Sequence, residues 1–265
     1  HAFLYGEKLF ILNPSIDKLY ETLIYIIAKT KNWHQLLIIS DKAYSKKIIN
    51  KNTLNENKSI GYYEIAKIKY SVNINDALKN IKKAIDLKKN FPPFIKLHLE
   101  LLAQSNNIQL LKKMIKKYWS QDPNPALRSV ITQIILNNKL GDLIFINQII
   151  KNSYNNDESK KLLIYFAIKN EDWKIARSNI IGLIGAHPTK EVCLFMADIE
   201  LGENNDKQKS DSWILRSENS ILDDIWVCKI TNQHQKEWNS LSDSGYFNSL
   251  VLSNSKMIDS KKYLK

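Results

Sequence analysis

The sequence contains few of the residues that characterise disulfide-rich, disordered or membrane-spanning proteins. Its two cysteines, Cys193 and Cys228, cannot supply a disulfide framework for 265 residues. With 7 glycines and 6 prolines against 44% hydrophobic residues, the chain has the composition of a folded protein. No segment approaches the roughly eighteen consecutive apolar residues that a membrane-spanning helix requires. These absences indicate a globular, helical protein.

Sequence motifs of catalysis are also missing. The chain has no glycine-rich phosphate loop, no nucleophile elbow and no His-Glu-x-x-His spacing. Acidic pairs such as Asp157-Glu158 and Asp223-Asp224 fall at helix starts or turns, where the helix dipole favours carboxylates. We therefore predict no catalytic residue and a protein that is not an enzyme.

Arginine is scarce in an otherwise basic chain. The formal net charge is +12, but only Arg128, Arg177 and Arg216 are arginines among 39 basic residues. Surfaces that recognise phosphate favour the planar guanidinium fork of arginine. A lysine-rich solvated surface is therefore the simpler interpretation, and we do not expect nucleic acid as the partner. The charge is compatible with a nearby anionic membrane surface.

A regular period is the most informative feature that is present. Turns of Asn, Asp or Gly, each followed by an amphipathic run, recur along the chain. From Asp76 the steps to the next turns are 31, 35, 30 and 34 residues. A single helix pair cannot bury its apolar face alone, so repeats of this length indicate stacked pairs. The predicted turns are Asn32-Trp33, Asn75-Asp76, Asn106-Asn107, Gly141-Asp142, Asp172-Trp173 and Asn205-Asp206.

Proline positions support the same period. Pro93, Pro125 and Pro188 each open the first helix of a unit, where the missing N–H costs nothing. Ser59 is a further predicted helix start. In the second helices, small residues such as Ala77 and Ala84 recur two turns apart, where two helices must approach closely. We predict an all-α fold, a right-handed solenoid of antiparallel helix pairs similar to tetratricopeptide repeats.

Three segments depart from the array. Residues 2–12 resemble the second helix of an interrupted pair, which predicts a fragment whose N-terminal part is removed. The polar run Asn50 to Lys58 lengthens the first step and is expected to be a flexible loop. After Ser220 the helical periodicity fades. We therefore predict a repeat domain over residues 1–220 and an irregular extension over 221–265 that caps the last helix pair, since end units otherwise expose a hydrophobic face.

The aromatic residues of the extension are its predicted anchors. We expect Trp226, Trp238 and Phe247 to pack the tail onto the final helix. Burial of such aromatic side chains stabilises by about 2–3 kcal/mol each.

The tail also resembles the start of a zinc knuckle, because a cysteine follows Trp226-Val227. A Cys-x-x-Cys partner of Cys228 would fall on Thr231, and a returning pair near Leu241 and Ser244. With His234 the segment offers at most two soft ligands, whereas structural zinc takes four. We predict no metal site.

The helix pairs resemble tetratricopeptide repeats in general pattern, and the tail resembles a more specific family. The tail and several upstream segments are similar, in order and spacing over roughly residues 60–252, to HemY-type proteins of alphaproteobacteria. These are membrane-anchored tetratricopeptide proteins. The segments that carry the resemblance are 118–126, 171–177, 194–200, 213–216, 224–228, 237–238 and 242–250.

The resemblance implies a cellular role but no catalysed reaction. It implies a missing N-terminal anchor in the bacterial inner membrane, with the soluble repeat domain on the cytoplasmic side. It further implies a scaffold for protein–protein interaction in haem biosynthesis, with haem-pathway enzymes as the partners. No cofactor is expected.

Two other functions stay open. The histidines, which are His1, His34, His98, His187 and His234, are scattered over different units and form no paired arrangement. A single histidine can ligate haem, so a haem or porphyrin carrier is one alternative. A nucleic-acid-binding helical repeat is the other.

In a helical repeat the first helices of the pairs line the binding groove. A helix-lined groove holds a partner segment through apolar and polar contacts. From periodicity, the predicted groove residues are Tyr63, Lys67, Lys96, Glu100, Arg128, Tyr165 and Lys169.

Overall fold

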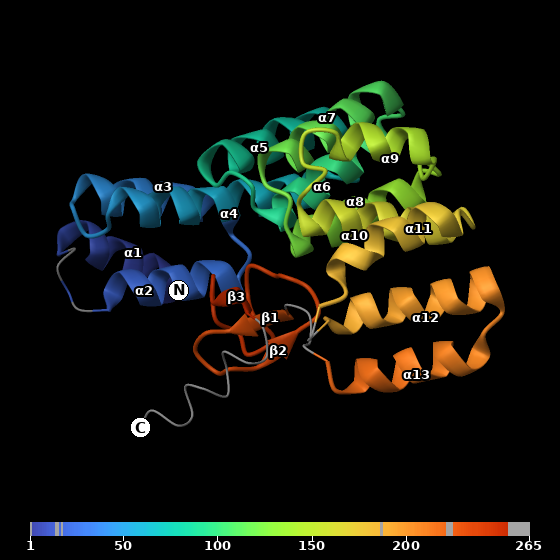
Figure 1. The fold of residues 1–265 in the computed structure, drawn as a ribbon. Helices are drawn as coiled ribbons and strands as arrows, with labels where there is room; N and C mark the ends of the chain where they lie inside the picture. Colours follow the sequence, from blue (N-terminus) through green and yellow to red (C-terminus); the bar gives the residue numbers. More distant parts are fainter. Residues whose placement is uncertain (1, 14–15, 17, 186–187, 221–224, 254–265) are drawn as a thin grey trace. The chain divides into compact units, whose positions relative to one another are not determined.

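A computed structural model describes residues 2–13, 16, 18–185, 188–220 and 225–253. The chain forms two compact units, and Figure 1 labels their helices and strands. Unit 1 combines His1–Asn106 with Ile225–Ser253, and unit 2 begins at Asn107 and runs to Asp224. The tail therefore joins the N-terminal unit, whereas the sequence suggested a boundary at residue 220. Several residues singled out above lie outside the described residues, namely His1, His187, Asp223 and Asp224.

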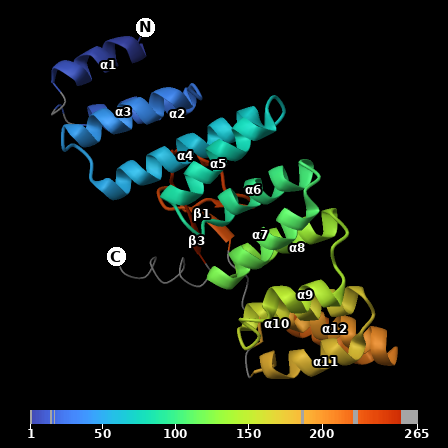
Figure 2. The ribbon, with the colours of Figure 1, turned by 90° about the horizontal axis from the view of Figure 1, so that it is seen from above.

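Unit 1 begins with six helices whose neighbours in sequence pack as antiparallel pairs, as Figure 2 shows from above. Their apolar faces supply two groups of buried side chains, one around α2–α3 and one around α4–α6. The helices are α1 (Ala2–Leu12), α2 (Leu19–Lys29), α3 (Trp33–Ser45), α4 (Lys51–Lys69), α5 (Ile74–Leu87) and α6 (Pro92–Gln104).

Unit 2 is built from helices alone within the described residues. Gly202 illustrates its packing, because a Cβ there would lie 2.2 Å from the ring of Trp173 on the neighbouring helix. The elements are α7 (Ile108–Gln121), α8 (Pro125–Asn137), α9 (Leu143–Ile150), α10 (Asp157–Lys169), α11 (Trp173–Ile180), the short 3-10 helix η1 (Ile181–Leu183), α12 (Lys190–Asn204) and α13 (Lys207–Glu218).

The predicted turns are confirmed as a recurring local structure. At four turns the residue before the cap adopts a positive φ of 53–58°, which ends the first helix in a left-handed conformation. The next residue, Asn or Asp, then accepts a hydrogen bond from the backbone N–H three residues later. These pairs are Lys31-Asn32, Asn106-Asn107, Glu171-Asp172 and Asn205-Asp206. At α5 the predicted turn, Asn75-Asp76, begins two residues after the observed helix cap, which is Asn73.

The expected flexible loop over residues 50–58 is wrong, because this segment forms the first half of α4. Asn50 caps the helix by accepting a hydrogen bond from the N–H of Thr53 at 2.9 Å. Leu54 is buried, and Asn57 donates to the hydroxyl of Tyr20 at 2.7 Å. The polar run therefore belongs to a 19-residue helix, and Leu54 and Asn57 are its buried members. Ser59, a predicted helix start, lies buried in its middle.

The tail folds into a small antiparallel sheet of three strands in the order β2-β1-β3. In the register, Trp226 lies opposite Gln235 and Leu252, and Cys228 lies opposite Leu250. Within residues 225–253 the prediction of a non-helical tail is confirmed, with more order than expected. The strands are β1 (Ile225–Cys228), β2 (His234–Gln235) and β3 (Leu250–Ser253).

The tail packs on α4 and α6, which corrects the expectation that it covers the final helix (Figures 1 and 2). Trp238, Cys228 and Leu250 belong to the same buried cluster as Ile60 on α4 and Phe94 on α6. Trp238 is 5% exposed in this cluster, whereas the only buried residues of α13 are Ser210 and Ser217.

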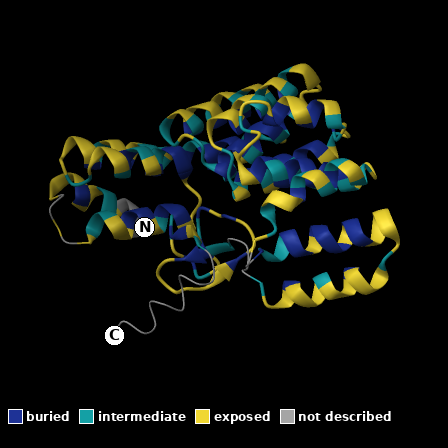
Figure 3. Cartoon of the chain, viewed as in Figure 1, coloured by how far each residue is buried: buried dark blue, intermediate teal, exposed yellow. Residues whose placement is uncertain are grey.

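The end of the helical array has little buried surface of its own. In α13 only Ser210 and Ser217 are buried, and Leu215 is 64% exposed. Its partner α12 is largely buried by comparison, as the colouring of Figure 3 shows.

Candidate partner-binding surfaces

The first predicted surface lies on α4 and α6, and the tail covers it. Tyr63 is 9% exposed and belongs to the buried cluster of unit 1. Its ring stacks on Phe94 with centroids 5.0 Å apart and meets the edge of Trp238 at 5.4 Å. Trp238 also contacts Phe91 edge-on at 5.1 Å. The predicted groove residue Tyr63 therefore binds a segment of its own chain.

Charged residues on the same two helices continue this contact. Lys96 Nζ lies 3.1 Å from Glu237 Oε1, next to Trp238 in the tail. Burial raises the pKa of Glu100, which Lys96 counteracts and Glu237 reinforces. Lys67 lies at the edge, with Nζ 3.6 Å from Glu64 Oε2 and 5.3 Å from the Tyr63 ring centroid.

The three tail aromatics differ in how deeply they are buried. Trp238 is 5% exposed, whereas Trp226 and Phe247 are only partly buried against the cluster. Trp226 meets the edge of Phe91 at 6.1 Å. Phe247 contacts both groups of buried residues in unit 1. Trp238 is therefore the anchor, and the other two support it.

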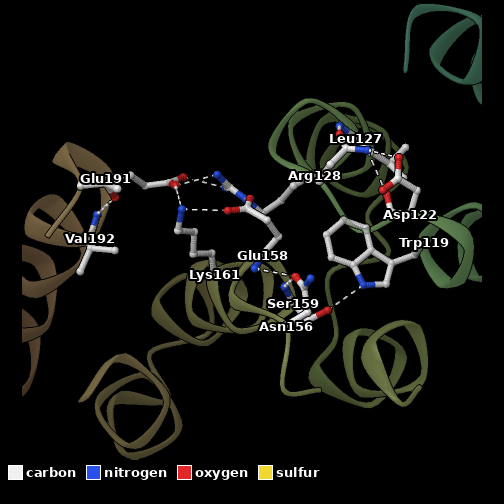
Figure 4. A network of polar contacts seen from close by, with 12 residues as sticks. Trp119, Asp122, Leu127, Arg128, Asn156, Glu158, Ser159, Lys161, Glu191 and Val192 are labelled. Atoms are coloured by element: carbon white, nitrogen blue, oxygen red, sulfur yellow. Dashed lines mark hydrogen bonds and ion pairs between the residues drawn. The ribbon is translucent and has the colours of Figure 1, made fainter. Parts of the chain in front are cut away.

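The second predicted surface lies on the first helices of unit 2, which are α8, α10 and α12. There Arg128 of α8 is held by carboxylates from both other helices (Figure 4). Its Nε donates to Glu158 Oε2 at 2.7 Å, and its two terminal nitrogens donate to the two oxygens of Glu191 at 2.6 Å. Lys161 Nζ lies 2.8 Å from Glu158 Oε1 and 3.8 Å from Glu191 Oε2. Two cations and two carboxylates thus join three helices.

This network is neutral as a group and fixed in geometry. Burial alone would raise the pKa of Glu158, but hydrogen bonds and charge from Arg128 and Lys161 hold it below its usual range. Glu158 thus stays ionised and paired at neutral pH, which does not suit a general acid or base. The bidentate Arg128–Glu191 pair is directional, so it orients α8 against α12. The ion network can therefore fix α8, α10 and α12 against one another and so position the surface that these helices form.

Tyr165 and Lys169 lie further along α10, beside α12. The Tyr165 ring is half-buried, with Phe195 of α12 at 6.5 Å between centroids, and Lys169 Nζ lies 5.9 Å from its centroid. Burial raises the pKa of Asp198 on α12, and the charge of Lys169 counteracts the shift. Leu194 of α12 is 40% exposed. An aromatic ring, a cation, a carboxylate and an apolar side chain therefore lie along two adjacent helices.

The sequence predicted one member of the ion network in unit 2, Arg128, as a functional residue, but not its partners Glu158, Lys161 and Glu191. Glu158 and Glu191 each follow the helix cap by two residues, and Lys161 follows Glu158 by three. This shared position after Asn156 and Thr189 was the available signal. The preference of carboxylates for helix starts accounts for Glu158 equally well, so the sequence alone does not distinguish a network from a dipole effect.

The segment compared with a zinc knuckle is held by hydroxyl groups. Thr231 Oγ1 and Ser244 Oγ are 3.0 Å apart, and Cys228 Sγ donates to Ser249 Oγ at 3.3 Å. Burial opposes ionisation of Cys228, but hydrogen bonds, chiefly from Ser249 and Thr231, lower the pKa of its thiol. No group of three or more potential metal-ligating side chains occurs among the described residues. Hydroxyl oxygens and one thiol do not match a structural zinc site.

The described histidines lie in separate places. His34 is exposed on α3, His98 is buried in α6, and His234 is exposed on β2. In the part of the chain that the structure describes, none of the helices is both long enough and apolar enough to span a bilayer.

Comparisons with known proteins give little further guidance. No family model matches the sequence, and no curated protein matches it. A tetratricopeptide repeat protein from Parabacteroides merdae, known from a crystal structure, is similar to the chain. It is 15% identical, over 83% of this chain and 85% of that one, with a TM-score of 0.40. Likeness at this level does not establish a shared fold, so the fold assignment rests on the helix pairs themselves.

Proposed function

We propose that the protein is a non-enzymatic scaffold that binds other proteins through the first helices of its pairs. The observation that carries this proposal is the docking of Glu237 and Trp238 on α4 and α6. In that contact a chain segment inserts an aromatic ring between the two helices and places a carboxylate on a lysine. This is the recognition mode expected of a helix-lined groove.

The first helices of unit 2 have similar chemistry and carry it at the surface. Tyr165 is half-buried, and Lys169 and Asp198 are exposed. The Arg128 network holds α8, α10 and α12 together. A partner segment with an aromatic side chain and an acidic neighbour would complement Tyr165 and Lys169, as Trp238 and Glu237 complement Tyr63 and Lys96.

We further propose the cellular role implied by the resemblance to HemY-type proteins. The scaffold would act in haem biosynthesis at the cytoplasmic side of the bacterial inner membrane, and its partners would be haem-pathway enzymes. The tail residues that carry the resemblance are the ones that cover α4 and α6.

A crosslinking experiment in native membranes tests the surface and the partner together. A photoreactive amino acid replaces Leu194 in the full-length protein, and crosslinked proteins are identified by mass spectrometry. We expect a haem-pathway enzyme among them, and we expect Tyr165→Ala with Lys169→Ala to reduce its yield. Lys174→Ala, an exposed lysine change on α11, is the matched control and should leave the yield unchanged.

Two results would overturn the proposal. Equal yields from the double variant and the parent would show that α10 is not the binding surface. A saturable Soret shift on titration of the purified chain with hemin would favour a haem carrier instead. Recovery of a partner outside haem synthesis would retain the scaffold and remove the pathway.

A further inference from the structure

Unit 2 distributes its charges unevenly between the first and second helices of its pairs. The helices α7, α9 and α11 contain five lysines and Arg177 but no Asp or Glu. In contrast, α10 and α12 contain six carboxylates. Lysine is spread over the whole chain, so the difference between the two sets of helices comes from where the carboxylates lie. Among the second helices of unit 2, α7 and α11 therefore carry positive charge without a carboxylate, α9 is uncharged, and α13 carries Asp211 and Glu218 beside its basic residues.

The positive charge is densest on α7. Lys112, Lys113, Lys116 and Lys117 form two pairs at a spacing of four residues, which places like charges next to each other on one side of the helix. Such pairs weaken a helix when no anion lies between them. Elsewhere in unit 2, lysines at a helix start pair with the carboxylate three residues before, as Lys161 pairs with Glu158. Among the described residues no carboxylate forms an ion pair with the four α7 lysines.

The exposed side of α9 continues this surface. Ile144, Asn147, Gln148 and Lys151 follow the spacing of one helix face, and all four are exposed. Lys116 Nζ lies 3.4 Å from Gln148 Oε1, which joins the two helices. Lys112 Nζ lies 4.9 Å from the centroid of the Phe145 ring. We call the four α7 lysines together with Ile144, Asn147 and Gln148 of α9 and Lys151, which follows that helix, the basic face.

Two carboxylates lie near the ends of these helices. Asp142 is the cap of α9 and accepts a hydrogen bond from the N–H of Phe145 at 2.8 Å. Asp122 follows the last residue of α7. Neither belongs to the helix faces that carry the lysines, so the basic face keeps its charge.

The chemistry of the basic face fits a lipid surface better than a nucleic acid. Its cations are all lysines, whose compact mobile ammonium groups suit the diffuse negative charge of a bilayer. Its large apolar side chain is Ile144, which is 76% exposed. An exposed aliphatic side chain among lysines is typical of segments that lie in the headgroup layer. Nucleic-acid surfaces use guanidinium forks and aromatic stacking, but Phe145, whose ring Lys112 covers, and Tyr118 and Trp119 of α7 are all buried.

We propose that the basic face binds the surface of a bilayer that contains anionic lipids. The lysines of α7 and Lys151 contact the headgroups, and Ile144 enters the interfacial layer. This inference rests on the proposed membrane location and adds which face of unit 2 meets the membrane. It assigns α7 and α9 to the lipid and leaves α8, α10 and α12 for the protein partner.

Vesicle sedimentation of the purified chain tests the proposal. The vesicles contain phosphatidylcholine alone, or phosphatidylcholine with phosphatidylglycerol. We expect binding to the anionic vesicles only, and we expect it to disappear at about 1 M salt, where the Debye length falls to about 3 Å. Lys113→Gln with Lys117→Gln should lower the partition coefficient by about tenfold or more, because each lysine near the surface contributes to the attraction. Ile144→Ser should lower it several-fold.

A matched double variant separates this face from net charge. Lys207→Gln with Lys209→Gln removes the same charge from α13, a helix that carries Asp211 and Glu218. This control should leave the partition coefficient within about twofold of the parent. Folding is checked by thermal unfolding, where relief of lysine repulsion should leave the Lys113/Lys117 variant at least as stable as the parent.

Three outcomes would overturn the inference. The first is absence of binding to anionic vesicles at low salt. The second is an equal loss in both double variants, which would indicate a response to net charge alone. The third is salt-dependent binding to random-sequence RNA that requires Lys113 and Lys117 while vesicles do not bind, which would assign the face to nucleic acid. The crosslinking test of the scaffold uses α12 and no added vesicles, so either proposal can fail alone.

Discussion

The two units present the same kind of helix face in different states. In unit 1 the first helices α4 and α6 are covered by the tail, and Tyr63 is buried against Trp238. In unit 2 the first helices keep Tyr165 half-buried and Lys169 exposed. Unit 1 is completed by an internal aromatic segment, and unit 2 is held by the Arg128 ion network. The difference suggests that α4 and α6 are structural and that α10 and α12 are available to a partner.

The largest expected effect is the loss of the tail anchor. Trp238→Ala should lower the free energy of unfolding by about 3–5 kcal/mol, because it leaves a cavity among Tyr63, Phe91 and Phe94. Hydrogen exchange should show the loss in α4 and α6 while amides in α10 and α12 keep their protection. Trp213→Ala, at a half-buried position on α13, is the control and should cost much less. An unchanged melting temperature for Trp238→Ala would contradict the packing described for unit 1.

The ion network of unit 2 should rank second. Arg128→Ala removes the stronger of the two cations that Glu158 and Glu191 share, leaves only Lys161 beside them, and should cost about 3 kcal/mol. Chemical denaturation measures the effect, with exchange of α10 and α12 amides as the local readout. A loss that appears in α4 and α6 instead would break the division between the two units.

The same network sets a dependence on pH. Because Arg128 and Lys161 hold the pKa of Glu158 below its usual range, its ionised form stabilises the fold. This stabilisation is fully present above the ordinary glutamate value of 4.5 and is lost as pH falls through the lower folded value. Arg128→Ala should therefore flatten the acid side of the stability curve. A curve parallel to that of the parent would show that Glu158 gains nothing from Arg128.

A smaller effect is expected at the start of α4. Asn50→Ala removes the cap of this helix and should cost about 1 kcal/mol. Asn50→Asp keeps an oxygen acceptor and serves as the control. If Asn50→Ala left the stability unchanged, the segment from residue 51 would behave as the loop that its composition suggests.

The smallest effect is expected for the charge at the tail contact. Glu237 is largely exposed, and Glu237→Gln removes only its surface ion pair with Lys96. Such pairs contribute about 0–1 kcal/mol, so the melting temperature should barely change. A loss as large as that of Trp238→Ala would show that charge, and not aromatic packing, holds the tail.

Local structure was largely predictable because its causes are local. Asn107, Asp172 and Asp206 were recognised as turn residues, since an Asn or Asp before an apolar stripe can satisfy the free N–H groups of a helix. The same rule applied to Asn50 but was masked by the polar residues after it. Only Leu54 and Asn57 are buried in the first two turns of α4, which is too sparse a pattern to recognise.

The destination of the tail could not be predicted from the sequence. Periodicity shows that Tyr63 lies on a helix face, but not whether another segment of the chain covers that face. Trp238 could be recognised as an anchor from its type, whereas its partners on α4 and α6 lie far away in sequence. Similarly, Arg128 is predicted from periodicity as a groove residue, but its pairing with Glu191 follows only from the positions of three helices.

The return of the tail to α4 and α6 has a consequence for synthesis of the chain. Asn248 meets Glu56 across 192 residues of sequence, so unit 1 remains incomplete until nearly the last described residue leaves the ribosome. The described helices of unit 2 all lie within Asn107–Asp224 and are therefore available earlier. Contacts between distant residues form slowly, because the intervening chain must first be ordered or looped out. In the growing chain, unit 2 should therefore fold while the aromatic face of α4 and α6 is still exposed to chaperones.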